Sequence, residues 1–300
     1  MSKRVSTCLV RRRPALLRRQ RVALLAHQAS IDAGYTHATT LLRDLRAVKL
    51  VALLAPEHGL WGAPQDHARI AGARDPATSL PVWSLYGARL EPTAAMLRGV
   101  DTVVIDLQDV GSRYYTFVWT TALAMRVCAR MGVRVVVLDR PNPLGGARVE
   151  GNVADPAFAS FVGLYPLAIR HGMTLGELAV YLNEQHAIGC HLTVVPMRGW
   201  RRAMLWEDTG LPWVAPSPNM PTPDTARVYS GAASSRARTC RRAGAPRVRS
   251  SGSAPPTSTR NDTRRRSSAS GSPASGFVPR ASCRRFRSGP GGSARASRFT

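Results

Sequence analysis

Acids, amides and imidazoles recur in this sequence directly after short apolar runs. They are His27, Gln28, Glu57, His58, Asp106, Gln108, Asp109 and Asp139. A carboxyl group can donate or accept a proton during catalysis, and an imidazole or amide can hold a polar ligand by hydrogen bonds. A single residue of this kind usually caps or ends a strand. Four such places in one chain favour a shared ligand site.

The apolar runs that precede these residues have the length and composition of strands buried on both faces. They cover residues 22–26, 50–55, 102–105 and 133–138, and a weaker strand covers 82–85. Between them, residues 39–48 and 116–131 carry apolar side chains at helical spacing. The alternation predicts an α/β fold: a Rossmann-like parallel sheet with crossover helices. Polar residues just past the carboxyl ends of such strands line the ligand crevice.

The remaining chain divides by composition. We predict a basic extension over residues 1–21, the Rossmann-like domain over 22–150, an incomplete smaller α/β domain over 151–229 and a disordered basic tail over 230–300. In the smaller domain, Thr174 and Glu177 form a capping box for a helix over 175–185. A short strand over 191–195 and a Pro-rich loop over 211–221 follow.

The net charge of +24 belongs to the two ends of the chain. Residues 1–21 hold eight Lys or Arg and no acid, and residues 231–300 hold sixteen Arg and one acid, Asp262. The middle is therefore close to neutral, with 44% hydrophobic residues in the whole chain to build a core. Collagen, mucin and membrane-spanning classes are excluded, and the charge by itself does not establish nucleic-acid binding.

Cysteine and histidine spacing favours neither a disulfide framework nor a metal site. The five cysteines form no CxxC pair, which indicates a reducing compartment or inert thiols. His27, His58 and His171 lack ligand spacing, and the loop over 27–34 lacks a Gly-rich phosphate cradle. We therefore expect no metal and no cofactor. Without a signal-peptide stretch the chain is expected in the cytoplasm, on the assumption that Met1 is the true start.

Six segments in a fixed order resemble the exo-β-N-acetylmuramidase family of bacterial cell-wall glycosidases. They are Val22–Gln28, Ala55–Leu60, Asp106–Thr116, Leu138–Pro143, Arg170–Thr174 and Pro216–Asn219. The resemblance covers residues 22–229. It implies release of N-acetylmuramic acid from the non-reducing end of peptidoglycan fragments, in a cleft between a Rossmann-like domain and a smaller domain. The expected partner is a peptidoglycan-derived amino sugar, with no specific nucleic acid and no membrane span.

Glycoside hydrolysis needs a carboxylic acid to protonate the leaving oxygen and usually a second carboxylate, unless the 2-acetamido group of the substrate attacks. Glu57 is the candidate general acid, because the tight turn between Pro56 and His58 can bury it partly. Asp106 is expected to orient another group or act on water. Asp109 is either catalytic or a helix cap.

Further residues are candidates for substrate binding. Arg113 and Arg170 are the candidate partners of the lactyl carboxylate of muramic acid, although each is as readily a surface ion pair. Trp61, Tyr115 and Trp213 are candidates for stacking on sugar rings. Gln28, His58, Gln108, Tyr115, His171 and Asn219 complete the predicted substrate-binding set.

The composition after Tyr229 suggests a changed reading frame. Starting each codon of residues 234–251 one nucleotide earlier can give a string that contains Glu-Gly-Thr-Asn and Gly-Arg-Gly-Thr. The resemblance implies that the family continues with these motifs after a turn matching Tyr229. We hypothesise a frame change between Val228 and Ser234, which would leave the product truncated and impaired. Two other functions stay open: a non-catalytic carbohydrate-binding protein and a nucleic-acid-binding protein with a basic tail.

Overall fold

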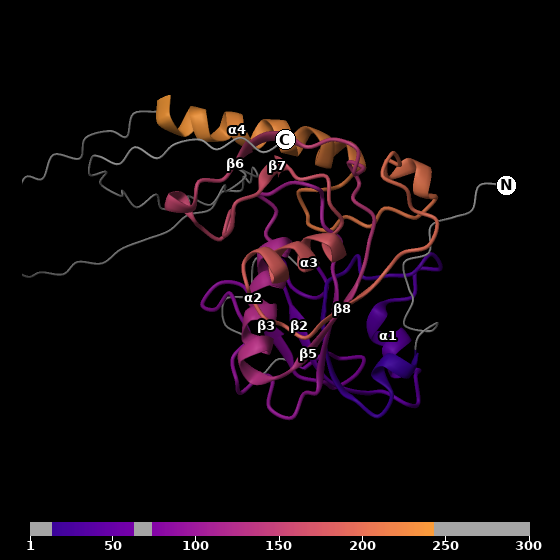
Figure 1. Cartoon of the computed structure of the whole chain (residues 1–300). Helices are drawn as coiled ribbons and strands as arrows, with labels where there is room; N and C mark the ends of the chain where they lie inside the picture. Colours follow the sequence, from indigo (N-terminus) through magenta and orange to yellow (C-terminus); the bar gives the residue numbers. More distant parts are fainter. Residues whose placement is uncertain (1–13, 63–73, 243–300) are drawn as a thin grey trace, which may run out of the picture. The chain divides into compact units, whose positions relative to one another are not determined.

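A computed structural model describes residues 14–62 and 74–242, with side chains described as far as residue 232 (Figure 1). Most of the predicted N-terminal extension and residues 243–300 of the predicted tail lie outside the described residues. A 3₁₀ turn over Pro14–Leu17 leads into the first strand. No helix among the described residues is long and apolar enough to cross a membrane.

The centre of the fold is a six-stranded parallel sheet in the order β3-β2-β1-β4-β5-β8. Its strands are β1 (Arg21–Ala26), β2 (Lys49–Ala55), β3 (Val82–Ser84), β4 (Thr102–Asp106), β5 (Arg134–Leu138) and β8 (Leu192–Val195). The predicted α/β fold is therefore confirmed. The strand order reverses direction between β1 and β4, the position at which doubly wound sheets open a crevice beyond their carboxyl ends.

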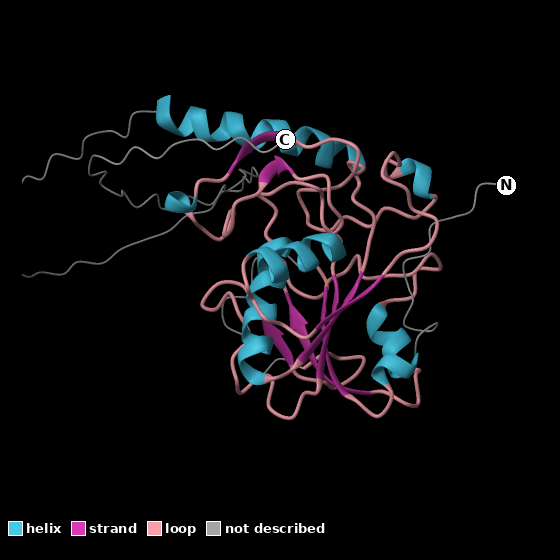
Figure 2. Cartoon of the chain, viewed as in Figure 1, coloured by secondary structure: helices cyan, strands magenta, loops and turns pink. Residues whose placement is uncertain are grey.

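Helices cover both faces of this sheet (Figure 2). α1 (Ala38–Arg43) packs on one face, and α2 (Phe117–Met131) and α3 (Leu175–Gln185) lie on the other. α2 is buried over most of its length and ends at Gly132, whose φ of 66° provides the left-handed residue that closes a helix. The capping box predicted for α3 is present, with Thr174 accepting from the backbone of Glu177.

The predicted domain boundary at residue 150 does not match the sheet. β8 comes from the segment assigned to the smaller domain, yet it pairs in parallel with β5, and α3 is the crossover between them. The described residues all belong to one compact unit. A helix followed by a short apolar strand is the same crossover unit that built the first strands, so composition gave no signal of a division here.

The rest of the 151–229 segment forms a smaller substructure. β6 (Glu150–Val153) and β7 (Ala168–Arg170) make a two-stranded antiparallel sheet, and 3₁₀ turns cover Pro156–Phe158 and Glu207–Thr209. The last helix, α4 (Pro223–Arg242), continues past the predicted boundary at 229. Alanine and arginine are among the best helix formers, which explains why the helix extends into a segment expected to be disordered.

Asp139 ties the sheet to α3. Its carboxylate accepts hydrogen bonds from Thr174 Oγ1 at 2.9 Å, the Gly176 amide at 2.8 Å and the Arg140 amide at 3.0 Å. Burial raises the pKa of Asp139 to about 6, against the opposing effect of these donors. The folded state therefore binds a proton in the range between 3.8 and about 6 in which the unfolded chain has already released it.

We therefore expect the free energy of unfolding to fall as the pH rises through this range. Asp139→Asn should remove that fall, so that the difference between wild type and variant changes by on the order of 2 kcal/mol between pH 4 and pH 6.5. Denaturant titrations at several pH values measure it, with the exposed Asp44→Asn as control. Parallel pH profiles for wild type and Asp139→Asn would contradict the assignment.

Candidate active site

His27 joins three segments at the carboxyl edge of the sheet. It follows β1 and is fully buried. Its Nδ1 lies 3.3 Å from the carbonyl oxygen of Pro216, and its Nε2 accepts from the Gln108 amide at 2.9 Å. Because a carbonyl can only accept, the ring proton belongs on Nδ1. Burial, with a smaller contribution from Arg140, lowers the pKa of His27 well below its usual value, so the ring is neutral.

Asp106 is paired inside the protein. Arg140 grips it with two hydrogen bonds, Nε to Oδ1 at 2.5 Å and Nη2 to Oδ2 at 3.0 Å, and Nη2 also donates to the carbonyl of Ile31 at 3.0 Å. Both carboxylate oxygens are used and the residue is 2% exposed. This geometry makes Asp106 an internal counter-ion that holds Arg140, and it does not support the predicted role for Asp106 on water.

Glu57 is held at the same edge by two hydroxyl groups. It follows β2 in a turn in which His58 and Gly59 have φ values of 70° and 76°. Thr116, at the start of α2, donates from Oγ1 to Glu57 Oε2 at 2.8 Å, and the Tyr86 hydroxyl also hydrogen-bonds to Glu57. Burial and this contact raise the pKa of Tyr86 to about 12, so its hydroxyl keeps its proton to donate. The Glu57 side chain is half-buried, as its predicted role requires.

Asp109 and His171 form a second polar pair. Asp109 Oδ2 accepts from the Gly111 amide at 2.7 Å and lies 3.3 Å from His171 Nε2. His171 Nδ1 accepts from the Met173 amide at 3.2 Å, which places the ring proton on Nε2, facing Asp109. Asp109 Oδ1 is buried and makes no hydrogen bond to any described residue. Asp109 therefore caps a turn with one oxygen, while the other is buried without a partner among the described residues.

Tyr115 is a buried phenol at the same edge of the sheet. Burial raises its pKa well above the ordinary value, and the negative charges of Asp109 and Glu57 add to the effect. Its ring packs edge-on against Phe117 at 4.6 Å and Tyr229 at 6.4 Å. The charges of both acids thus act on the Tyr115 phenol.

The two predicted amides hold neighbouring loops together. Gln108 Nε2 donates to the carbonyls of Asp109 and Pro141 at 2.8 and 2.9 Å. Gln28 Nε2 donates to the carbonyl of Ala215 at 2.8 Å, and a Cβ at Gly62 would lie 2.7 Å from the Gln28 side chain. The Oε1 atoms of both glutamines are buried without a partner among the described residues.

The two arginines predicted to bind the lactyl carboxylate, Arg113 and Arg170, do not point toward one common position. Each contacts groups of the protein itself. Arg113 is buried and donates from Nη1 to the carbonyls of Asn152 at 2.7 Å and Leu167 at 2.5 Å. Arg170 pairs with Glu150 at 2.7 Å. Both side chains therefore brace the β6 and β7 hairpin. The sequence does not predict the hydrogen bonds of Arg113, because every residue has a backbone carbonyl and the residue type does not reveal which carbonyl accepts.

The predicted aromatic residues differ in exposure. Trp61 is 50% exposed, donates from Nε1 to Asp75 at 3.2 Å and packs against His37 with ring centroids 4.7 Å apart. Trp213 is half-buried, donates to the carbonyl of Met220 at 3.1 Å and packs edge-on against another tryptophan. Asn219 is exposed beside it, and His58 is half-buried in the turn after Glu57.

Sequence reasoning missed Tyr86, Thr116 and the anchoring role of His27. Tyr86 lies just past the end of the weakest predicted strand. Like Glu57, it is therefore a polar residue at the carboxyl end of a strand, and the same criterion could have selected it. Among the described residues, no group of three or more His, Cys, Asp or Glu side chains is arranged to hold a metal ion.

Comparison with known proteins supports the reading of these motifs. The sequence model described as the N-terminal part of the exo-beta-N-acetylmuramidase NamZ matches residues 22–224. The chain is 44% identical over 213 residues to the peptidoglycan beta-N-acetylmuramidase NamZ of Bacillus subtilis (strain 168). The chain belongs to the NamZ exo-β-N-acetylmuramidase family. That alignment covers 71% of this chain and 51% of the Bacillus protein.

Two solved structures agree with this assignment to the NamZ family. Both are DUF1343 family proteins of Bacteroides fragilis NCTC 9343. One has a TM-score of 0.70 at 38% identity and the other 0.64 at 29% identity. They cover 75% and 76% of this chain and are themselves covered over 58% and 60%. The chain thus spans about half the length of the curated NamZ relative and about three fifths of the solved ones.

His27→Ala should destabilise the fold by about 2–4 kcal/mol, because the Gln108 amide loses its acceptor and a buried cavity opens. Denaturant unfolding at pH 7 measures the change. The exposed His191→Ala is the control and should differ from wild type by less than about 0.5 kcal/mol. An equally small effect for His27→Ala would show that the imidazole does not anchor this edge.

Proposed function

We propose that the described residues carry the catalytic edge of a glycosidase that releases N-acetylmuramic acid from the non-reducing end of peptidoglycan fragments. The observation that carries the proposal is the position of Glu57. It is half-buried past β2 and is held by the hydroxyls of Thr116 and Tyr86. Membership of the NamZ family supports the substrate class.

In this proposal Glu57 is the general acid. The two hydroxyl donors fix the rotamer of its carboxyl group, and protonation of the glycosidic oxygen lets the leaving sugar depart. Asp109 is the second carboxylate, because Asp106 is tied to Arg140 whereas Asp109 Oδ1 is without a partner among the described residues. The Gly111 amide donates to the other oxygen of Asp109, and His171 Nε2 lies 3.3 Å from that oxygen.

We also propose that the chain as it stands is impaired by a change of reading frame between Val228 and Ser234. About half of the Bacillus NamZ protein has no counterpart in its alignment with this chain. The shifted frame can give the Glu-Gly-Thr-Asn and Gly-Arg-Gly-Thr motifs that the resemblance implies. The smaller substructure of β6, β7 and α4 would then lack the segments that complete the cleft.

Glu57→Gln should lower kcat on a chromogenic muramoside by roughly 10²–10⁴-fold with little change in KM, because glutamine keeps the shape but cannot donate the proton. The exposed Glu91→Gln serves as the control and should keep full turnover. Both are measured in the frame-restored chain. A protein that only binds carbohydrate would show no turnover in either variant, and unchanged turnover in Glu57→Gln would exclude this general acid.

Restoring the frame at codons 228–234 should raise release of muramic acid by at least about tenfold over the chain as it stands. Sequencing the locus provides the independent check. Equal turnover by the two chains, or a tail encoded in the same way in intact related genes, would reject the frame change and leave the assignment of Glu57 untouched.

A further inference from the structure

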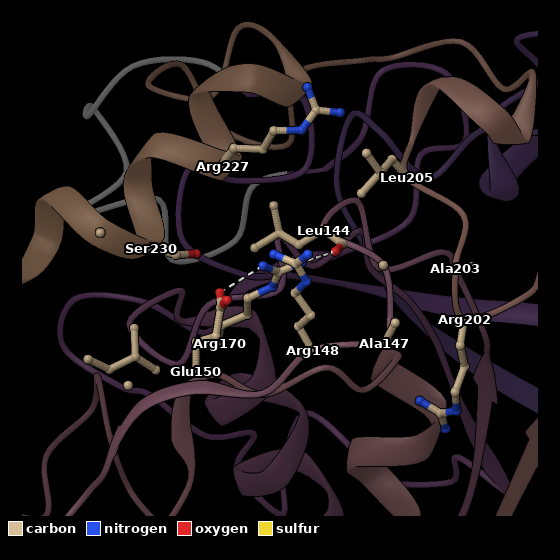
Figure 3. A pocket seen from close by; sticks show the side chains of 14 residues that line it. Leu144, Ala147, Arg148, Glu150, Arg170, Arg202, Ala203, Leu205, Arg227 and Ser230 are labelled. Atoms are coloured by element: carbon tan, nitrogen blue, oxygen red, sulfur yellow. Dashed lines mark hydrogen bonds and ion pairs between the residues drawn. The ribbon is translucent and has the colours of Figure 1, made fainter.

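A cavity of about 760 Å³ lies between the β6 and β7 hairpin, the loop around residues 202–205 and α4 (Figure 3). Neither Glu57 nor Asp109 lines it, so it is a different place from the candidate active site. Small-molecule sites in proteins usually have volumes of a few hundred to about a thousand Å³, and the cavity falls in that range.

Arginines dominate the charge of this cavity. Arg148, Arg170, Arg202 and Arg227 line it, and Glu150 is the one acid among its lining residues. Arg202 is already neutralised by Glu177 at 2.5 Å, and Arg227 by Glu207 at 2.5 Å and by Asp224. The charges left for a ligand are therefore those of Arg148, Arg170 and Glu150.

Arg170 and Glu150 form an ion pair at 2.7 Å, which leaves one positive charge without compensation. Arg148 is exposed and forms no ion pair with any described residue, and it shares the charge of Glu150 with Arg170. Figure 3 shows the side chains of Arg148 and Arg170 both extending into the cavity. The Nε atom of Arg170 is buried and makes no hydrogen bond to a described residue.

The walls beside these guanidinium groups are apolar. They are formed by Leu144, Ala147, Ile169, Ala203 and Leu205. A ligand that fits must therefore combine negative charge with an apolar group at its side. Because the uncompensated charge is a single one, a carboxylate matches it better than a doubly charged phosphate ester.

We propose that this cavity is a binding site for a small organic carboxylate with an adjacent apolar group. Arg148 forms the principal contact with the carboxylate, since a guanidinium can donate two parallel hydrogen bonds to it. Arg170, held in place by Glu150, contributes the second guanidinium. The site is independent of glycosidic chemistry at Glu57.

Titration calorimetry of the full chain with N-acetyl-L-alanine and with its neutral amide tests the proposal. The two probes differ only in the charged group, and we expect the acid to bind about tenfold or more tightly than the amide. Arg148→Ala should abolish this preference and Arg148→Lys should keep part of it. The exposed Arg98→Ala, which does not line the cavity, should leave it unchanged.

Three results would overturn the proposal: equal binding of acid and amide, no binding of either, or an unchanged preference in Arg148→Ala. Inorganic phosphate is the competing probe, and stronger binding of phosphate than of the acid would show that the charge argument is wrong. Glu57→Gln should have no effect on binding of N-acetyl-L-alanine. A loss of binding in that variant would place the probe in the active site.

Discussion

The neutral, buried imidazole of His27, just past the end of β1, holds together the loops at the carboxyl edge of the sheet. The register of β1 and β4 places Ala26 opposite Asp106, so His27 leaves the sheet near the residues that follow Asp106. One ring nitrogen then accepts from the β4 side and the other faces the carbonyl of Pro216, far along the chain. Each of these polar groups would be costly to bury without its partner, so the loops that carry the candidate site are fixed relative to one another.

The need of a buried polar group for a partner also distinguishes Asp106 from Glu57. Asp106 sits deepest, and burial of its charge is compatible with the fold only because Arg140 offers two hydrogen bonds in a fixed plane. Glu57 lies nearer the surface and is bound by neutral hydroxyls, which position a carboxyl group without neutralising it. The contacts of Asp106 therefore include a charged partner, whereas the two hydrogen bonds to Glu57 come from uncharged groups.

The arginines also differ in burial and in their partners. Arg113 and Arg140 are buried and spend their donors on carbonyls or on a carboxylate, so they stabilise loops. Arg148 is exposed at the wall of a cavity and forms no ion pair with any described residue. Charge type alone does not distinguish these roles, and the partner of each guanidinium decides which of them can take a ligand.

The sequence by itself determined the sheet, its carboxyl edge and the acids on that edge, because parallel strands with crossover helices bring successive strand ends to one side. It also singled out Glu57, Asp109 and Tyr115 as candidates at that edge. Only the tertiary structure decided that Asp106 belongs to Arg140 and that β8 joins the main sheet. The physical reason is that periodicity is a local property of the chain, whereas the partner of a buried charge or a strand edge is set by contacts between residues far apart in sequence.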